Sequence, residues 1–223
     1  MKKAFVATAV SGLLLTASIL PVSAHNGSFR DIPENHTFYK EIYKLHEKGI
    51  IKGHKDGYFN AYQKVTRAQA ATMIARALEL DLTNIVKPNF TDIVETNEHY
   101  QAIAKLTELG IFKNDTSFNP NGFLTRAQMA KILVLAFELK SNTEKPFDDV
   151  NTKEFKKYTG IIGALNITTN NGRYNPNKYV TRGQLAAFLE RVINNKRLVK
   201  DNDPWDRWND WEELERRYQP KSR

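Results

Sequence analysis

Apolar side chains recur at helical spacing in three similar stretches of the chain, residues 65–80, 124–139 and 180–195. In the first stretch, Met73, Ile74 and Ala77 fall on one face of a helix with this spacing, and the other two stretches repeat the pattern. An amphipathic helix is therefore predicted in each. Self-similarity at a near-fixed period indicates that the chain is built from internal repeats.

Each of the three stretches begins with a threonine that is followed three residues later by a glutamine. In a capping box, the threonine hydroxyl accepts a hydrogen bond from the third helical amide, and the glutamine side chain accepts one from the threonine N–H. The threonines are 59 and 56 residues apart. The expected capping pairs are Thr66 with Gln69, Thr125 with Gln128, and Thr181 with Gln184.

A shorter amphipathic pattern precedes each capped stretch and begins at an aromatic residue: Tyr39, Tyr100 or Phe155. Each such helix is expected to end in a left-handed residue, for which Gly49, Gly110 and Asn166 are suited. An aspartate opens each repeat, and an aromatic–asparagine pair precedes each capping threonine. The aspartates are Asp31, Asp92 and Asp149, and the pairs are Phe59–Asn60, Phe118–Asn119 and Tyr174–Asn175.

One helix–loop–helix unit buries too few large apolar side chains, at roughly 1.5–3 kcal/mol each, to offset its own chain entropy. The three units must therefore pack together. The sequence predicts an all-α fold, a pseudo-threefold bundle with the capped helices innermost. Its repeats are expected at residues 25–86, 87–146 and 147–199, followed by a tail at 200–223.

The first 24 residues resemble a secretory signal peptide, with Lys2 and Lys3, an apolar run and Val22-Ser23-Ala24. No later segment is expected to span a membrane. Without this peptide, the net charge is +6, which suits an acidic partner. Export argues against nucleic acid as that partner. The chain contains no cysteine, and its five histidines show no paired spacing for a metal. Neither a metal nor a cofactor is expected.

Arg67, Arg126 and Arg182 directly follow the capping threonines, although capping makes no demand on that position. The first turn of a helix is an unfavourable place for a cation because of the helix dipole. A cation beside unpaired backbone amides would form an anion-binding corner. The alternative is a guanidinium bonded to a carboxylate or carbonyl inside the fold. Because the arginine appears three times, we favour the anion-binding hypothesis.

These landmarks, in the same order three times, resemble the S-layer homology domain in triplicate. The resemblance covers Phe29 to about Lys196. It implies a secreted bacterial protein held non-covalently at the cell wall through an acidic, pyruvylated secondary cell-wall polysaccharide. In that family the polymer binds in grooves between repeats. The motif arginine engages the acidic sugar, and this role maps onto Arg67, Arg126 and Arg182.

The resemblance also suggests further groove residues. Tyr39, Tyr100 and Phe155 stand where the family has tryptophan and are candidates for stacking on a sugar. Asp31, Asp92 and Asp149 either bond sugar hydroxyls or fix the start of a repeat as turn residues. The loop 53–57 either lines a groove or is a plain turn.

The chain departs from the family pattern at several positions. All three motifs have glutamine where the family has glutamate, which keeps the cap but removes a carboxylate. The third copy has Gly183 in place of alanine and lacks Gly-Ile. Its groove is expected to be the weakest, so that Arg126→Ala would weaken binding more than Arg182→Ala.

Three other readings stay open. No catalytic motif is present, so we expect a non-enzyme, and the alternatives are a wall-acting enzyme that uses the repeats for targeting or an adaptor that recruits a partner. Nonspecific binding to anionic lipid or nucleic acid is a weaker alternative.

The tail holds Trp205, Trp208 and Trp211. It is expected to form a short helix that either packs on the third repeat or mediates protein binding or self-association.

Overall fold

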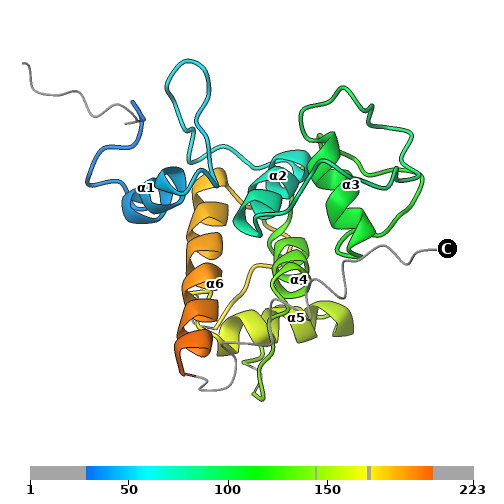
Figure 1. Ribbon diagram of the computed structural model, residues 1–223. Helices are drawn as coiled ribbons and strands as arrows, with labels where there is room; N and C mark the ends of the chain where they lie inside the picture. Colours follow the sequence, from blue (N-terminus) through cyan, green and yellow to red (C-terminus); the bar gives the residue numbers. More distant parts are fainter. Residues whose placement is uncertain (1–28, 144, 170–171, 203–223) are drawn as a thin grey trace, which may run out of the picture.

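The computed structural model describes residues 29–143, 145–169 and 172–202 (Figure 1). These residues form six α-helices and no β-strand, which confirms the all-α prediction. The expected leader at 1–24 and the tail tryptophans Trp205, Trp208 and Trp211 lie outside the described residues. None of the described helices combines the length and the hydrophobicity that a membrane span requires. The helices are α1 (Tyr39–Glu47), α2 (Arg67–Ala77), α3 (Tyr100–Glu108), α4 (Arg126–Ala136), α5 (Lys153–Ala164) and α6 (Arg182–Asn202).

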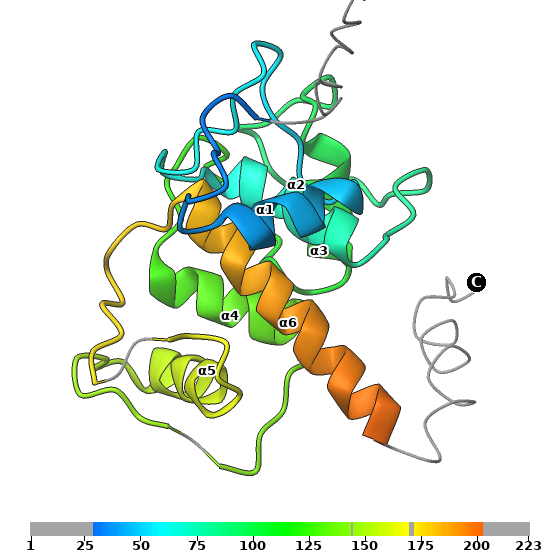
Figure 2. The same cartoon turned by 90° about the vertical axis from the view of Figure 1, so that its left-hand side faces the viewer.

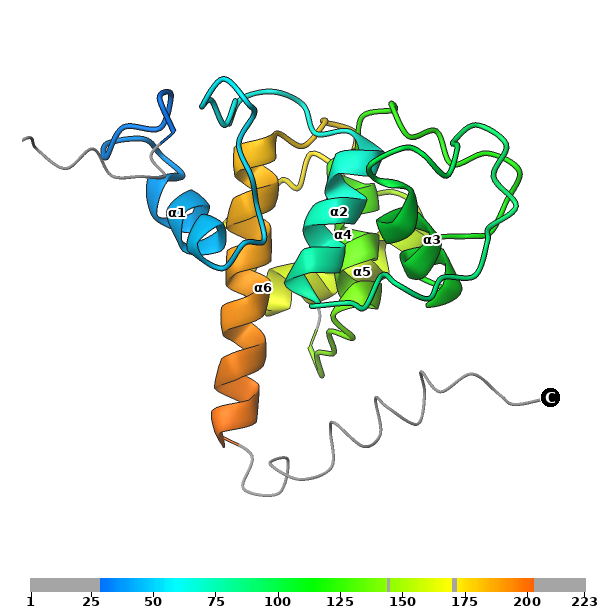
Figure 3. The same cartoon turned by 45° about the horizontal axis from the view of Figure 1, so that its top comes forward.

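The ends of the helices follow local sequence. The first helices of the repeats lead into Gly49, Gly110 and Asn166, which adopt positive φ angles of 69°, 72° and 52°. The sequence pattern did not indicate that Glu79 and Glu138, after α2 and α4, also adopt positive φ angles. α6 is the longest helix and continues past residue 199, where the third repeat was expected to end. Figure 3 shows it extending beyond the other helices.

The helices pack in pairs that cross the repeat boundaries. α3 of the second repeat packs on α2 of the first, and α5 of the third packs on α4 of the second. α1 of the first repeat packs on α6 of the third, so the pairing returns to its start. Figures 1 and 3 show α1 beside α6 and α3 beside α2, and Figure 2 shows α5 below α4. The sequence repeat is therefore not the unit of helix packing.

Three backbone hydrogen bonds join the residues just before the capping threonines. The Val65 N–H donates to the Val180 carbonyl at 2.9 Å, and the Val180 N–H donates to the Leu124 carbonyl at 2.9 Å. The Leu124 N–H donates to the Val65 carbonyl at 3.1 Å. We call these three bonds the central ring. The three side chains are fully buried, so the ring fixes the starts of α2, α4 and α6 relative to one another.

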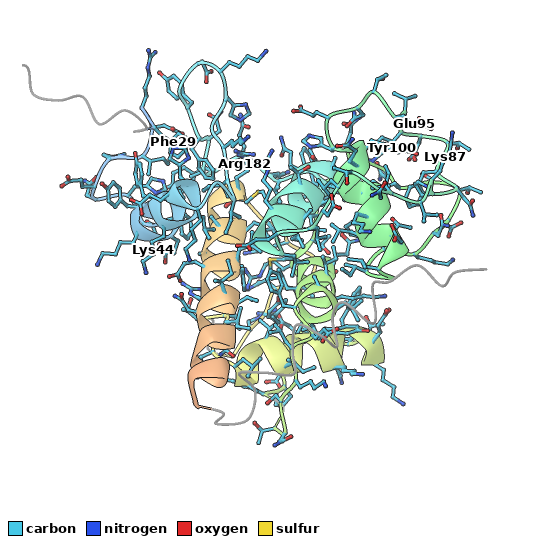
Figure 4. The ribbon with its side chains drawn as sticks, in the orientation of Figure 1. Phe29, Lys44, Lys87, Glu95, Tyr100 and Arg182 are labelled. Atoms are coloured by element: carbon cyan, nitrogen blue, oxygen red, sulfur yellow. The ribbon has the colours of Figure 1, made fainter. Side chains whose placement is uncertain are left out.

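At least one polar contact between side chains supports each helix pair. The Lys44 ammonium (labelled in Figure 4) lies 2.9 Å from Glu190 and ties α1 to α6. The Thr72 hydroxyl lies 2.8 Å from His99 Nδ1 and ties α2 to the start of α3. Lys131 pairs with Glu154 and ties α4 to α5. The apolar pairing is therefore supported by side chains that differ from one pair to the next.

Gly183, in the first turn of α6, has a packing explanation. A Cβ atom at this position would lie 2.5 Å from the Phe38 ring and 3.2 Å from the Ala61 Cβ. We expect Gly183→Ala to lower the free energy of unfolding by about 1–3 kcal/mol, because overpacking outweighs the better helix propensity of alanine. Urea denaturation measures this change.

The control for this prediction is the same substitution in a Phe38→Ala background. With the ring removed, Gly183→Ala should be neutral or stabilising, by up to about 1 kcal/mol from helix propensity. A stabilising effect of Gly183→Ala alone would contradict the close contact.

Candidate functional site

The three motif arginines reach from the start of one repeat's second helix into the loop of another repeat. In each case Nε donates to the carbonyl of the loop aromatic. The distances are 2.8 Å from Arg67 to Phe118, 2.7 Å from Arg126 to Tyr174 and 2.9 Å from Arg182 to Phe59. Thus the first repeat reaches the second, the second reaches the third, and the third reaches the first.

Each guanidinium also lies over the ring of the aromatic residue whose carbonyl it binds, with 4.7–4.8 Å between the guanidinium carbon and the ring centroid. This is the range of a cation–π contact. Arg126 and Arg182 are buried, and Arg67 is half-buried. Burial lowers the pKa of all three guanidinium groups. They stay cationic at neutral pH because an arginine starts from a very high pKa.

The expectation of unpaired amides at these helix starts is wrong. The Arg67 N–H donates to the Gly122 carbonyl at 2.9 Å, and the Ala68 N–H donates to the Pro120 carbonyl at 3.1 Å. The first two amides of α4 and α6 bind loop carbonyls of a neighbouring repeat in the same way. The third amide binds the capping threonine, as in Gln69 N–H to Thr66 Oγ1 at 3.2 Å, with the same arrangement at Thr125 and Thr181. An anion would therefore meet the guanidinium group rather than the helix terminus.

The aspartates that open the repeats hold the loops on which the arginines rest. The Asp31 carboxylate accepts from the amides of Phe59 and Asn60, both at 2.7 Å. Asp92 and Asp149 bind the equivalent amides at 2.6–2.8 Å. Burial alone would raise the pKa of Asp92 and Asp149, but these hydrogen bonds lower it overall. Of the two alternatives for these aspartates, the geometry matches the turn-fixing role.

The aromatic residues proposed for sugar stacking are packed against the protein. Tyr100 is only 5% exposed, so its ring has almost no surface left for a sugar. Tyr39 packs on Tyr43 with 4.5 Å between ring centroids. Phe155 is half-buried against the core. None of the three lines the pocket described next.

A pocket of about 390 Å³ lies where Arg182 meets the first repeat. The Arg182 Nη2 donates to the Lys52 carbonyl at 3.2 Å, next to its contact with Phe59. Figure 4 shows Arg182 at the start of α6, where the first and third repeats meet. The walls are the loop after α1, the exposed side of α2 and the start of α3. Lining residues include Lys52, His54, Lys55, Gln69, Thr72, Arg76, Glu98, His99 and Arg182.

The pocket is strongly basic. Lys52, Lys55, Arg76 and Arg182 carry permanent positive charge at neutral pH, whereas Glu98 is the carboxylate among the lining residues. The cations come from the first and third repeats, so the pocket forms only when these repeats meet. A concave, cationic wall of this kind is suited to an acidic ligand.

The other two arginines have different surroundings. Arg126 lies between the rings of Tyr174 and Phe188, at 4.8 and 5.4 Å, and its Nη2 is buried without a hydrogen-bond partner in the described residues. In the second repeat, Leu135 stands at the position of Arg76. The pocket at Arg182 thus combines a motif arginine with Arg76, a cation that the second repeat replaces by an apolar residue.

The pairing of each arginine with another repeat suggests a different ranking of the grooves from the one expected, and either ranking stays a prediction. The third copy was expected to be weakest because it has Gly183 and lacks Gly-Ile. Arg182, however, works with the loop of the first repeat, in which Gly49-Ile50 is present. The repeat that supplies an arginine and the repeat that supplies its loop are different.

Comparison with known proteins shows which proteins this chain is similar to. The family model described as S-layer homology domain matches residues 28–71 and 89–130, within the first two expected repeats. The S-layer protein sap of Bacillus anthracis is 31% identical over 197 residues, 85% of this chain and 24% of that protein. The surface-layer 125 kDa protein of Lysinibacillus sphaericus is 36% identical over 205 residues, 87% of this chain and 17% of that protein.

A third relative carries the name of an enzyme. A protein named an uncharacterized cell wall amidase, from Bacillus anthracis, is 28% identical over 202 residues, 85% of this chain and 37% of that protein. The chain therefore spans between about a sixth and just over a third of the length of these relatives. The similarity extends over most of this chain but over a minor part of each relative.

Proposed function

We propose that this chain is a non-catalytic anchor that binds an acidic, pyruvylated secondary cell-wall polysaccharide, because two of its segments match the S-layer homology domain. The chain acts outside the cell, at the wall. The first binding groove is the pocket at Arg182, where the third and first repeats meet and the start of α3 adds a wall. Two of the relatives are named surface-layer proteins, which supports a location at the cell surface.

The observation that carries this proposal is the charge of the pocket. A carboxylate held there would lie in a pocket that Arg182, Arg76, Lys52 and Lys55 line. A hydrogen bond between charged groups contributes about 1.5–3 kcal/mol, more than a neutral one. Burial of the Arg182 guanidinium limits its competing hydration and fixes its orientation. The remaining wall, with Gln69, Thr72 and His99, offers groups that bind sugar hydroxyls.

Arg76→Ala should reduce the affinity of the chain for wall sacculi about tenfold or more, because one charged contact in the pocket is lost. Arg182→Ala should also weaken binding, and more than Arg126→Ala, since Arg182 lines the pocket. Cosedimentation of the full chain with purified sacculi measures both. The matched control is Lys87→Ala, which removes a 77% exposed cation elsewhere on the surface (Figure 4).

The ligand itself is tested by stripping the wall polymer from the sacculi with mild acid. Binding should disappear with the polymer. Equal binding to stripped sacculi, or equal loss in the Lys87→Ala control, would show that the pocket does not recognise the polymer. Melting curves identify any variant that has lost its fold.

The relative named as an amidase motivates a second candidate, an exported enzyme that uses the repeats for targeting. Incubation of the chain with wall fragments distinguishes this function from anchoring. Released sugars or peptides would establish catalysis, and their absence together with polymer-dependent binding would favour the anchor.

A further inference from the structure

Two large aromatic side chains are exposed beside the three backbone hydrogen bonds of the central ring. Phe123 is 45% exposed and Tyr179 is 46% exposed, although both adjoin fully buried residues. Together with Lys64 they occupy equivalent positions in the three repeats, two residues before each capping threonine. We call Lys64, Phe123 and Tyr179 the apical cluster.

The apical cluster is a contiguous group with a defined geometry. The ring centroids of Phe123 and Tyr179 are 5.6 Å apart, and the rings are inclined by 62°. The Lys64 ammonium lies 5.3 Å from the Phe123 centroid and 4.8 Å from the Tyr179 centroid. One cation therefore contacts both rings while its side chain stays exposed to solvent.

The backbone beneath the cluster is held in place from every side. Short antiparallel bridges pair Lys64 with Thr181, Thr66 with Phe123, and Thr125 with Tyr179. The three side chains thus project from a backbone that folding has already fixed. Binding of a ligand to these side chains therefore costs little conformational entropy in the protein backbone.

The Phe123 and Tyr179 rings are not needed to shield the hydrophobic core from solvent. Val65, Leu124 and Val180 close the core directly beside them and are fully buried. Exposed rings next to an ammonium group present an apolar face and a positive charge within one small area. An acidic sugar has the matching chemistry, because the C–H face of a pyranose is apolar and its acidic substituent is anionic.

A second copy of the chain fits this surface less well. A stable protein interface needs roughly 800 Å² from each partner, far more than three side chains provide. The chain is also basic overall, so a like-charged copy would bring Lys64 toward further cations.

We propose that the apical cluster is a second carbohydrate-binding site, separate from the pocket at Arg182, in which Phe123 and Tyr179 stack on a pyranose and Lys64 receives its acidic substituent. This inference rests on the proposed function, because it takes the same acidic polymer as the ligand. None of the three residues lines the pocket at Arg182. A polymer long enough to reach both sites would bind with avidity.

The test uses nuclear magnetic resonance on the full chain with isotope-labelled Phe and Tyr rings and labelled backbone amides. The probe is a methyl pyranoside with a 4,6-linked pyruvate ketal, compared with the ketal-free parent sugar. Single Phe123→Ala and Tyr179→Ala variants assign the ring signals. The titration is repeated in an Arg76→Ala background, which weakens the pocket but leaves the apical cluster intact.

We expect the ring signals of Phe123 and Tyr179 to shift in both backgrounds, with a smaller response to the ketal-free sugar. Lys64→Ala should remove this preference for the ketal. In sacculus binding, Phe123→Ala with Tyr179→Ala should lower the affinity roughly five- to tenfold. The control Tyr62→Ala, which removes a 69% exposed ring outside the cluster, should have no effect.

The outcomes separate this inference from the proposed function. If pocket amides shift while the rings of Phe123 and Tyr179 do not, the second site is wrong and the pocket stands. If the rings shift but the pocket amides do not, the apical site stands without the pocket. If the double variant instead abolishes a dimer seen in sedimentation velocity, the cluster is a self-contact and the inference is overturned.

Discussion

Tyr174→Ala should lower the free energy of unfolding by about 3–5 kcal/mol, the range for removal of a fully buried aromatic side chain. The Tyr174 ring is completely buried, packs on Phe147 at 5.2 Å and supports the Arg126 guanidinium at 4.8 Å. Its hydroxyl donates to the Arg126 carbonyl at 3.1 Å. The substitution therefore leaves a cavity where two repeats meet, and chemical denaturation measures the loss of stability.

Two controls separate the contributions to this prediction. Tyr174→Phe keeps the ring and loses the hydroxyl, so it should cost only about 1 kcal/mol. Tyr179→Ala removes the same side chain from an exposed position five residues later, and it should cost less than about 1 kcal/mol. Equal destabilisation by Tyr174→Ala and Tyr179→Ala would show that the loop ring is not part of the core.

Asp149→Asn should lower the free energy of unfolding by about 2–4 kcal/mol, because the carboxylate accepts two backbone amides that an asparagine cannot both satisfy. The amides of Tyr174 and Asn175 lie 2.8 and 2.7 Å from its oxygens. The neighbouring Asp148 is exposed and provides the matched control. Asp148→Asn should change the stability by no more than about 0.5 kcal/mol.

The same contact predicts how stability depends on pH. Burial would raise the pKa of Asp149, but the hydrogen bonds lower it below its ordinary value. A carboxyl group whose pKa is lower in the folded state stabilises the protein above its unfolded pKa of about 3.9, and this contribution is lost as pH falls through the folded value. Stability should therefore decline below about pH 4. The decline should be smaller in Asp149→Asn and unchanged in Asp148→Asn. An identical pH profile for all three proteins would contradict the assignment.

The helices could be predicted from sequence because their signals are local. Capping pairs and apolar spacing indicate the starts of α2, α4 and α6 at Arg67, Arg126 and Arg182, and left-handed residues mark where the first helices end. The choice of packing partner is not local. An apolar face shows that a helix must be covered, but it does not specify which of several similar helices covers it. The pairing of α1 with α6 therefore had to come from the structure.

The candidate site likewise combines residues that the sequence predicted with residues that it did not. Comparison of the copies singled out Arg67, Arg126 and Arg182, because a residue that recurs without a capping role needs another explanation. The same comparison missed Arg76 and His99, because Leu135 stands at the position of Arg76 in the second repeat and Glu154 at the position of His99 in the third. A search for recurring residues does not select the residues that distinguish one groove from another. Their signal in the sequence is the contrast between copies.

The pairing across repeats has a consequence for how this architecture can vary. Stacked repeat proteins are open arrays, in which units can be added or removed at the ends and the terminal units need polar caps. Here α1 packs on α6, and this contact covers the helix faces on which an added repeat would have to pack. Loss of one repeat would leave two of the described helices without partners, and an added repeat would meet faces of α1 and α6 that are already paired. Among the described residues, the first and last helices must therefore come together before either is fully buried.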